Sequence, residues 1–463
     1  MDFDWIVLGA GPGGYEAAIR AAQLGQKVAL VEKGEVGGTC LNRGCIPTKA
    51  LLHGAAQVDS LSRMKAWGIQ GVYVSYDLNR MYERKDEIVS ALRQGISQLL
   101  SQNRIELIKS QGVIVDSHTV RAEGKTYTAG RILIATGSVP LRPVIPGIDL
   151  PGVVTSDELL AAPPVMKSMV IIGGGVIGVE FATMFAALGV QITILEAMDR
   201  LIPQMDREIS QNLSMILKKR GVSMCTGAKV ALIEKEADGA LTVRYEGKDT
   251  QGKAAGDAVL CAIGRRAYTG GLFGEGFSLE MDRGRIVTDE NHQTSVPCVY
   301  AIGDVTGGFQ LAHAASAQGI ACVEQAAGIT PHINERIVPA CVYTEPEIAC
   351  VGLTADEAKA KGMEIRTGKY VLSGNGRTLI AGGERGFVKL VVDGKTDTVL
   401  GAQLMCERAT DMVNELTLAV ANGFTREQLL RAIRPHPTFS ESITEALESV
   451  EGKAIHMAPP RRL

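Results

Sequence analysis

Two cysteines stand close together in the segment GGTCLNRGCIPTKALL, residues 37–52, where Cys45 follows Cys40 by five positions. Pro47 comes two residues after Cys45, and the sequence beyond it has helical character. Because proline suits the first turn of a helix, we expect Cys45 at a helix N-terminus. The helix dipole stabilises a thiolate there and lowers the pKa of the thiol. The pair is therefore a candidate for thiol–disulfide exchange.

The residues alone leave a second interpretation of this pair open, in which both cysteines are buried and unreactive. A zinc site is less favoured, because no second pair of cysteines or histidines has the spacing of metal ligands. The chain holds nine cysteines, scattered over its length. That odd number favours a reducing compartment over the disulfide framework of a secreted protein.

The same sequence pattern occurs twice in the chain, once before these cysteines and once after them. Residues 5–33 and 169–197 align without a gap at an offset of 164. Each copy reads as an apolar strand, the motif G-x-G-x-x-G, a helix, a second apolar strand and a glutamate. The first copy supplies Gly9, Gly11, Gly14 and Glu32, and the second supplies Gly173, Gly175, Gly178 and Glu196.

Each copy predicts a βαβ unit that binds a dinucleotide. The glycines bring the backbone close to a pyrophosphate at a helix N-terminus, and the glutamate accepts hydrogen bonds from a ribose. One such motif is weak evidence, but two copies with the same glutamate offset leave little room for chance. Glu196 would repel a 2′-phosphate, so the second site favours NAD over NADP unless Arg200 folds back toward it.

Two dinucleotide sites beside a thiol pair favour electron transfer as the chemistry. Nicotinamide moves a hydride, whereas a disulfide is reduced through thiolate attack. A flavin can exchange electrons with both, which makes FAD and NAD the expected cofactors.

Length and charge narrow the class of protein. The chain has 463 residues, 46% of them hydrophobic, and a net charge of −3. These values predict a globular protein of about two to four domains and give no reason to expect nucleic acid or an anionic membrane as partner. Residues 169–195 are long and apolar, but their glycines cluster where a strand would turn into a helix, so we expect a buried parallel strand there. The N-terminus shows no targeting pattern, so we expect a cytoplasmic protein or a mature form.

These motifs, together with RILIATGS, VYAIGD and HPTFSES, resemble the flavoprotein pyridine nucleotide-disulfide oxidoreductase family over essentially the whole chain. The resemblance implies an α/β fold with two Rossmann-like dinucleotide-binding domains, one for FAD and one for NAD. A central domain and a C-terminal α+β dimerisation domain complete it. The implied ranges are 1–146 for the FAD-binding domain, 147–264 for the NAD-binding domain, 265–335 for the central domain that completes the FAD site, and 336–463 for the interface domain.

Within this family the chain is most similar to members that oxidise dihydrolipoamide. The resemblance implies that dihydrolipoamide becomes lipoamide while NAD⁺ is reduced, through a Cys40–Cys45 redox disulfide and FAD. It further implies a homodimer that serves 2-oxo acid dehydrogenase or glycine cleavage complexes through their lipoyl-bearing proteins. Two alternatives stay open, a glutathione-reductase-like disulfide reductase and a mainly structural subunit of a multienzyme complex.

The family pattern also assigns roles to individual residues. His436 would accept a thiol proton, oriented by Glu441, and would reach the cysteines of the other subunit. The implied catalytic residues are Cys40, Cys45, Lys49, His436 and Glu441. The implied FAD contacts are Gly9, Gly11, Gly14, Glu32, Thr39, Lys49, Gly112, Thr136, Gly137, Ser138, Asp304, Gln310, Leu311, Ala312 and His313. The implied NAD contacts are Gly173, Gly175, Gly178, Glu180, Glu196, Val230 and Gly264, and Glu180 would also pair with Lys49 beside the flavin.

Three positions depart from the family pattern. Arg43 stands between the cysteines where an apolar residue is usual, and Arg434 replaces a histidine or a small residue. Either charge is expected to alter the substrate channel. The segment GRRAYTGG, residues 264–271, lacks the usual proline and asparagine, which leaves the packing of that loop open.

Overall fold

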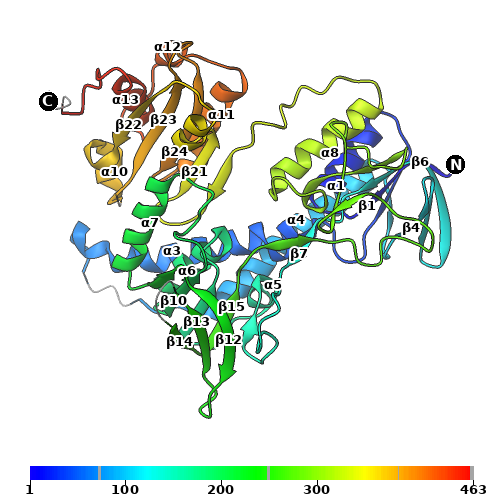
Figure 1. The fold of residues 1–463 in the computed structure, drawn as a ribbon, viewed down its shortest axis with the longest axis horizontal. Coiled ribbons are helices and arrows are strands. Elements are labelled where there is room, and N and C mark those ends of the chain that lie inside the picture. The colour runs from blue at the N-terminus through cyan, green and yellow to red at the C-terminus, as the bar shows by residue number, and fades with distance from the viewer. Residues whose placement is uncertain (71–73, 248–250, 384, 459–463) are drawn as a thin grey trace.

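The computed structural model describes residues 1–70, 74–247, 251–383 and 385–458 of the chain (Figure 1). Its N-terminal region is built on a seven-stranded sheet in the order β3-β2-β1-β6-β5-β4, with β19 paired to the free side of β6. Strands β1, β2, β3, β6 and β19 run parallel to one another, whereas β4 and β5 form an antiparallel extension of β6. The strands are β1 (Phe3–Leu8), β2 (Val28–Val31), β3 (Glu106–Ile108), β4 (Val113–Asp116), β5 (Thr119–Ala122), β6 (Lys125–Ile134) and β19 (Val299–Ala301).

Helices cover this sheet and carry the cysteine pair. The helix α1 starts at Pro12, directly after the first glycine motif, and packs against α8. The short helix α2 ends at Arg43, and α3 starts at Cys45, which confirms the expected helix N-terminus at this cysteine. The helices are α1 (Pro12–Gln23), α2 (Gly38–Arg43), α3 (Cys45–Ser62), α4 (Leu78–Gln102) and α8 (Ala312–Ala326), with the 3₁₀ turns η1 (Met64–Trp67) and η2 (Gly303–Val305).

The second repeat forms a five-stranded parallel sheet in the order β11-β10-β9-β15-β8. The apolar segment 169–195 is the β9–α6–β10 unit of this sheet, as its glycines predicted. Its elements are β8 (Val153–Val154), α5 (Ser156–Ala161), β9 (Ser168–Ile172), α6 (Val176–Ala187), β10 (Gln191–Glu196), α7 (Arg207–Lys219), β11 (Ser223–Thr226) and β15 (Ala258–Cys261). An antiparallel sheet beside it holds β12 (Lys229–Lys235), β13 (Leu241–Glu246) and β14 (Gln251–Gly256).

Short strands connect the two nucleotide-binding regions. Strand β7 (Ser138–Pro140) pairs antiparallel with β16 (Arg265–Ala267), and β17 (Met281–Asp282) pairs with β18 (Arg285–Ile286).

No helix in the described part of the chain is long and apolar enough to span a bilayer. The two parallel sheets with their helices confirm the predicted α/β class.

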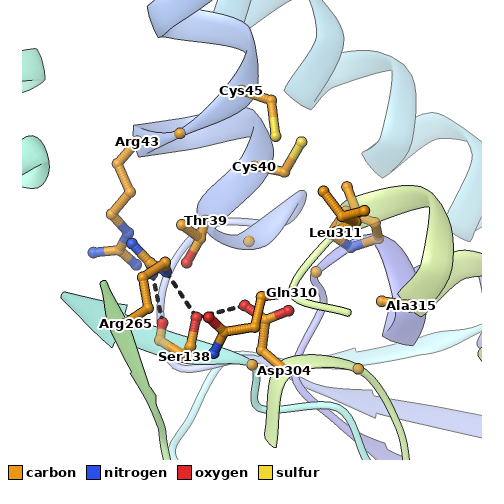
Figure 2. A pocket seen from close by; sticks show the side chains of 18 of the residues that line it. Thr39, Cys40, Arg43, Cys45, Ser138, Arg265, Asp304, Gln310, Leu311 and Ala315 are labelled. Atoms are coloured by element: carbon orange, nitrogen blue, oxygen red, sulfur yellow. Dashed lines mark hydrogen bonds between the residues drawn. The ribbon is translucent and has the colours of Figure 1, made fainter. Parts of the chain in front are cut away.

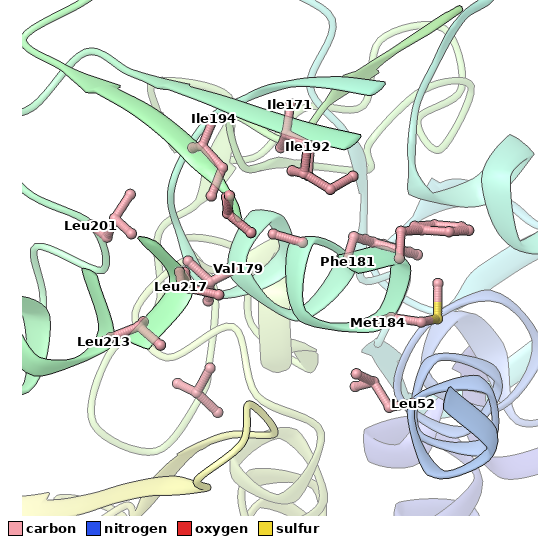
Figure 3. Packing of buried hydrophobic residues seen from close by; sticks show 14 of the residues in the cluster. Leu52, Ile171, Val179, Phe181, Met184, Ile192, Ile194, Leu201, Leu213 and Leu217 are labelled. Atoms are coloured by element: carbon pink, nitrogen blue, oxygen red, sulfur yellow. The ribbon is translucent and has the colours of Figure 1, made fainter. Parts of the chain in front are cut away.

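A buried apolar cluster joins α3 to α6. Leu52 of α3 contributes to the same cluster as Phe181 and Met184 of α6 (Figure 3). Because burying one apolar side chain of this size stabilises the fold by about 2 kcal/mol, the cluster fixes α3 against the second repeat. The helix that begins at Cys45 is thereby held between both dinucleotide-binding regions.

The C-terminal region is a five-stranded antiparallel sheet in the order β20-β21-β24-β23-β22 with helices packed on it. Its strands are β20 (Ala340–Val342), β21 (Ile348–Gly352), β22 (Ile365–Val371), β23 (Phe387–Asp393) and β24 (Val399–Met405). Its helices are α9 (Ala355–Ala360), η3 (Leu372–Gly374), α10 (Gly376–Ala381), α11 (Ala409–Ala421), α12 (Arg426–Leu430) and α13 (Glu441–Ser449).

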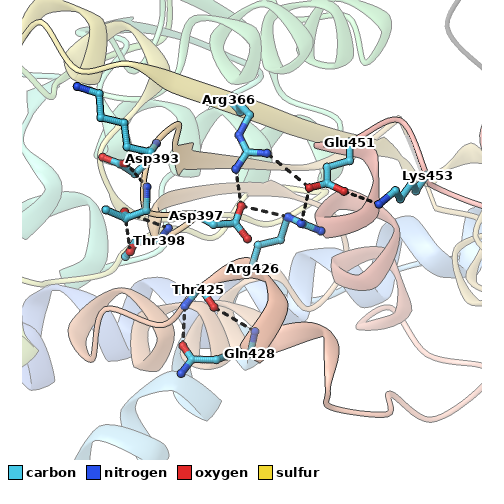
Figure 4. Close-up of polar contacts among 11 residues, drawn as sticks. Arg366, Asp393, Asp397, Thr398, Thr425, Arg426, Gln428, Glu451 and Lys453 are labelled. Atoms are coloured by element: carbon cyan, nitrogen blue, oxygen red, sulfur yellow. Dashed lines mark hydrogen bonds and ion pairs between the residues drawn. The ribbon is translucent and has the colours of Figure 1, made fainter.

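A polar network ties the start of α12 to the residues after α13. Arg426 of α12 donates to Asp397 at 3.3 Å and to Glu451 at 2.7 Å, and Arg366 of β22 donates to Asp397 at 2.5 Å (Figure 4). Only 10% of the Arg426 side chain is exposed, so these hydrogen bonds to charged groups are partly shielded from water. The network therefore joins the two helices that flank the loop of His436, at their ends far from that loop.

Candidate active site

A cavity of about 860 Å³ opens at the carboxyl end of the first parallel sheet. Its wall is formed by the start of α1, the redox segment, the start of α8 and Cys341 of β20. Of the residues predicted from the sequence, it is lined by Gly9, Gly11, Glu32, Thr39, Cys40, Cys45, Lys49, Gly112, Thr136, Gly137, Ser138, Glu180, Asp304, Gln310, Leu311, Ala312 and His313. A cavity of this size suits a large cofactor.

The glycines of the first motif are required by close backbone contacts. Gly9 has φ +102°, and a Cβ on Gly14 would lie 1.8 Å from the carbonyl oxygen of Gly9. A side chain at Gly14 would push α1 away from β1, and a Cβ on Gly9 would lie 2.4 Å from the carbonyl oxygen of Ala135. A Cβ on Gly11 would meet nothing closer than 3.9 Å, which leaves its backbone open to the cavity.

The second motif repeats this geometry. Gly173 has φ +108°, a Cβ on Gly178 would lie 2.0 Å from the carbonyl oxygen of Gly173, and Gly175 has open space. Glu196 accepts hydrogen bonds from the backbone N–H groups of Gly174 and Met198, at 2.5 and 2.7 Å. Glu32 in the first copy accepts two as well, from Ala10 and Gly34 at 2.7 Å each. Both glutamate side chains are thus fixed in position beside their glycine motifs.

The two cysteines face each other at the redox segment, where both are free thiols (Figure 2). The hydrogen bond between them makes their protonation states unequal. It lowers the pKa of Cys45 despite the opposing effect of burial, with further help from the positive charge of Lys49. It raises the pKa of Cys40, and burial adds to that rise. Cys45 is therefore the thiol that ionises first.

Lys49 and Glu180 form an ion pair between α3 and α6. The Nζ of Lys49 donates to both carboxylate oxygens of Glu180, at 3.0 and 2.8 Å. Only 3% of the Glu180 side chain is exposed, and its second donor is the backbone N–H of Tyr343 at 3.0 Å. The pair holds a positive charge beside Cys45, which agrees with the predicted pairing.

A chain of hydrogen bonds joins three residues that line the cavity, Arg265, Ser138 and Asp304. Ser138 donates to Asp304 at 2.5 Å, and Arg265 donates to Ser138 through Nε and Nη2, both at 2.8 Å (Figure 2). Arg43 points toward Arg265, and its Nε lies 3.9 Å from Asp157. Arg43 therefore lines the cavity, and its effect on the substrate channel stays a prediction.

His436 and Glu441 lie together, but away from the cysteines of the same chain. The Nδ1 of His436 lies 2.6 Å from Glu441, and 80% of the histidine side chain is exposed. Burial raises the pKa of Glu441, but the N–H of Thr438 and the His436 ring outweigh it and lower that pKa overall. Neither residue lines the cavity. Within one chain the structure does not bring this pair to Cys40.

The other predicted residues of the second site lie around its sheet. Val230 is buried on β12, and Gly264 has φ +117° after β15. The Nη2 of Arg200 donates to the carbonyl of Pro203 at 2.9 Å, and its Nη1 lies 3.7 Å from Asp199. Arg434 is 5% exposed and is bound by Glu415 of α11 and Thr444 of α13, so its charge is neutralised in the domain interior.

Two residues that contribute to the site, Arg265 and Tyr343, were not predicted from the sequence. Arg265 follows the glycine of a Gly-Arg pair, and that pair was a usable signal for a cavity residue. The backbone N–H of Tyr343, the residue after β20, reaches Glu180, which is 163 residues away in the sequence. No local pattern could have predicted that contact, because backbone donors carry no residue signature.

The residues present fit the two expected cofactors. The first motif leaves the backbone at Gly11 open at the start of α1, where free N–H groups favour a pyrophosphate. The second motif offers the same opening at Gly175, beside a carboxylate that disfavours a 2′-phosphate. The donor sets therefore suit FAD at the large cavity and NAD at the second motif.

Comparison with known proteins agrees with this geometry. Residues 3–319 match the model of the pyridine nucleotide-disulphide oxidoreductases, and residues 338–447 match the dimerisation domain of the same family. The chain is 39% identical to a dihydrolipoyl dehydrogenase of Bacillus subtilis, with 98% of this chain and 99% of that protein covered. It is 40% identical to a dihydrolipoyl dehydrogenase of Thermus scotoductus, with 98% and 99% covered.

Solved structures show the same fold. The HOCl-induced flavoprotein disulfide reductase RclA from Escherichia coli matches with a TM-score of 0.86 at 32% identity, covering 96% of this chain and 99% of that one. FAD and NAD(H) are the cofactors of the family. The chain belongs to the pyridine nucleotide-disulphide oxidoreductase family.

Proposed function

We propose that this protein oxidises dihydrolipoamide to lipoamide and reduces NAD⁺, with Cys40 and Cys45 as its redox disulfide. The observation that carries the proposal is the asymmetric cysteine pair at the start of α3, beside the Lys49–Glu180 ion pair and between two dinucleotide motifs. The similarity to dihydrolipoyl dehydrogenases over nearly the whole chain supports the choice of substrate.

The thiol chemistry uses the difference between the two cysteines. A substrate thiolate attacks Sγ of Cys40 in the oxidised protein, so that the Cys40–Cys45 bond breaks and a mixed disulfide forms. Cys45 leaves as the thiolate, favoured by Lys49. The second substrate sulfur then attacks the substrate sulfur of the mixed disulfide, closes the lipoamide ring and releases the Cys40 thiol.

His436 is the proposed acceptor of the substrate thiol proton. Glu441 holds the Nδ1 side of the ring, which leaves Nε2 as the basic nitrogen. Because neither residue lines the cavity of its own chain and the His436 side chain is largely exposed, we assign the pair to the cavity of the partner in a homodimer. The matched dimerisation domain supports that assembly.

The remaining residues bind and position the cofactors. FAD, held by Glu32, the first glycine motif, Ser138 and Asp304, would supply two-electron transfer between the reduced cysteines and NAD⁺. Lys49, Thr39 and residues 310–313 line its cavity. Glu196, Val230 and Gly264 would hold NAD, and the fixed Glu196 carboxylate favours NAD over NADP.

We assign the lipoyl-bearing proteins of 2-oxo acid dehydrogenase or glycine cleavage complexes as the partners, in a cytoplasmic location. The relatives named dihydrolipoyl dehydrogenase and the scattered cysteines support these assignments. A second candidate is the reduction of other disulfides, which the likeness to RclA favours.

NADH formation from dihydrolipoamide and NAD⁺, followed by absorbance, tests the proposal. Oxidised glutathione with NADPH and a Cys45→Ser variant are measured beside it. We expect rapid NADH formation by the parent protein and none by Cys45→Ser with FAD still bound. Turnover by Cys45→Ser, or activity with glutathione and NADPH alone, would contradict the proposal.

A further inference from the structure

The loop after the second nucleotide-binding region is fastened to the first one. Strand β16 pairs with β7, so that Ala267 lies opposite Ser138. The N–H of Tyr268 donates to the carbonyl of Gly137 at 2.9 Å, and the hydroxyl of Thr136 donates to the carbonyl of Tyr268 at 2.7 Å. Tyr268 is thereby held from both sides at the carboxyl end of β6.

The next residues fasten the same loop further along. The side-chain amide of Gln111 donates to the carbonyl of Gly271 at 3.1 Å, and the N–H of Ile114 donates to the carbonyl of Leu272 at 2.8 Å. The loop has these anchors although it lacks the proline and asparagine usual in the family. Its position is therefore set by the first sheet.

Tyr268 meets Lys33 at the edge of the cavity. The Nζ of Lys33 lies 3.6 Å from the centroid of the Tyr268 ring, and both residues line the cavity. Lys33 directly follows Glu32, at the end of β2. The contact joins two segments that are far apart in the sequence, and a cation over an aromatic face is attractive at this distance.

Core packing does not account for the Tyr268 ring. The ring is only partly buried and lies outside the hydrophobic clusters of the described residues, whereas its neighbours Leu272 and Phe273 belong to one. An aromatic ring kept out of the core and placed at a cavity wall offers a flat face to a ligand.

The position of Glu32 identifies which part of a dinucleotide would reach this wall. In a βαβ unit the pyrophosphate lies over the glycines, and the carboxylate after the second strand binds the ribose of the adenosine half. Adenine is attached to that ribose, so it belongs beside Lys33 and Tyr268. The cysteines and Lys49 mark the redox end.

We propose that Tyr268 and Lys33 form a clamp on the adenosine end of FAD that slows release of the cofactor. This clamp rests on the use of FAD and on the first glycine motif as its site, and it does not depend on dihydrolipoamide as substrate. The Tyr268 face contacts the base, and Lys33 keeps the ring in position from its other segment.

The rate of FAD release from the holoprotein tests the clamp, measured as the rise in flavin fluorescence after dilution. We expect Tyr268→Ala to release FAD about tenfold faster than the parent protein and Lys33→Met about threefold faster. Tyr268→Phe keeps the ring and should stay within about twofold of the parent. Thr269→Ala is the matched control, because Thr269 is in the same loop but does not line the cavity.

Three results would overturn the clamp. The first is release of FAD from Tyr268→Ala at the parent rate. The second is release from Tyr268→Phe as fast as from Tyr268→Ala. The third is a raised KM for NADH in Tyr268→Ala while FAD release is unchanged. If Tyr268→Ala does not fold, the exposed Lys33→Met variant decides the question, since release at the parent rate would then refute the clamp. If the parent protein does not oxidise dihydrolipoamide but Tyr268→Ala still releases FAD faster, the proposed function fails and the clamp stands.

Discussion

Cys45 and Cys40 differ in their electrostatic surroundings although they line the same cavity. The hydrogen bond between the thiols and the charge of Lys49 act in the same direction on Cys45, and they outweigh its burial. A thiol whose pKa is lowered keeps its thiolate at pH values where an ordinary cysteine is protonated. The reduced protein should therefore present one reactive thiolate near neutral pH.

We predict that Cys40→Ala raises the pKa of Cys45, because the largest favourable contribution is the hydrogen bond from Cys40. The measurement is the rate of Cys45 alkylation by iodoacetamide against pH in the reduced protein. The rise of the profile should move to higher pH, so that alkylation at pH 7 is slower. Cys298→Ala, outside the cavity, should leave the profile in place, and an unmoved profile in Cys40→Ala would contradict the assignment.

The buried Glu180 carboxylate depends on Lys49 for its charge partner. Lys49→Met leaves a carboxylate that is 3% exposed with the Tyr343 N–H as its remaining donor. We expect a loss of about 2 kcal/mol, less than for a fully buried pair because Lys49 is partly exposed and screened. The thermal midpoint of the holoprotein reports the loss. Adding Glu180→Gln should recover most of it, and equal midpoints for the parent and Lys49→Met would contradict a stabilising pair.

At the scale of elements, the glycine motifs fix how closely each helix approaches its strand. A Cβ on Gly14 would lie 1.8 Å from the Gly9 oxygen, so Gly14→Ala must displace α1 from β1. We predict that this variant is isolated with little FAD, as measured by the flavin absorbance per chain. Gly95→Ala is the matched control, because Gly95 is exposed on α4 with open space for a Cβ.

The Gly95→Ala control has an expected effect on stability. Alanine is favoured over glycine in a helix by about 1 kcal/mol, so Gly95→Ala should bind FAD normally and melt slightly higher. A Gly14→Ala protein with full FAD content would show that close approach of α1 is not required for binding.

Local patterns also explain which elements could be predicted from the sequence. The strand–glycine–helix repeats and the start of α3 at Cys45 follow from residue types within short windows, and the structure contains both. The Arg265–Ser138–Asp304 chain joins three segments through side-chain geometry. The sequence indicated Ser138 and Asp304 separately, but their contact and the Arg265 donor depend on the β7–β16 pairing, which no local pattern specifies.

At the scale of the whole molecule, the position of His436 has the largest consequence. Helix α13 lies in the C-terminal region, on the side of the molecule away from α1 and β1 (Figure 1). The sequence resemblance predicted a base that acts on the other subunit, and the exposed His436–Glu441 pair outside the cavity is compatible with that role. The domain boundaries at 146, 264 and 335 stay predictions.

Coexpression of a Cys45→Ser chain with a His436→Gln chain tests whether the site is shared. In a shared site, half of a random mixture is heterodimer, and each heterodimer has one intact site of two, so we expect roughly a quarter of the parent activity. Each variant alone should have almost none. If the coexpressed mixture were no more active than the variants alone, His436 would act within its own chain.

Differential alkylation of the cysteines tests the central claim most directly. The oxidised holoprotein is treated with dihydrolipoamide, alkylated before or after NAD⁺ is added, and each cysteine peptide is quantified by mass spectrometry. We predict that Cys40 and Cys45 become alkylated after dihydrolipoamide and are protected again once NAD⁺ is added, while labelling of the other seven cysteines is unchanged. Failure of dihydrolipoamide to expose these two thiols, or of NAD⁺ to protect them again, would contradict the claim that this pair carries electrons from substrate to NAD⁺.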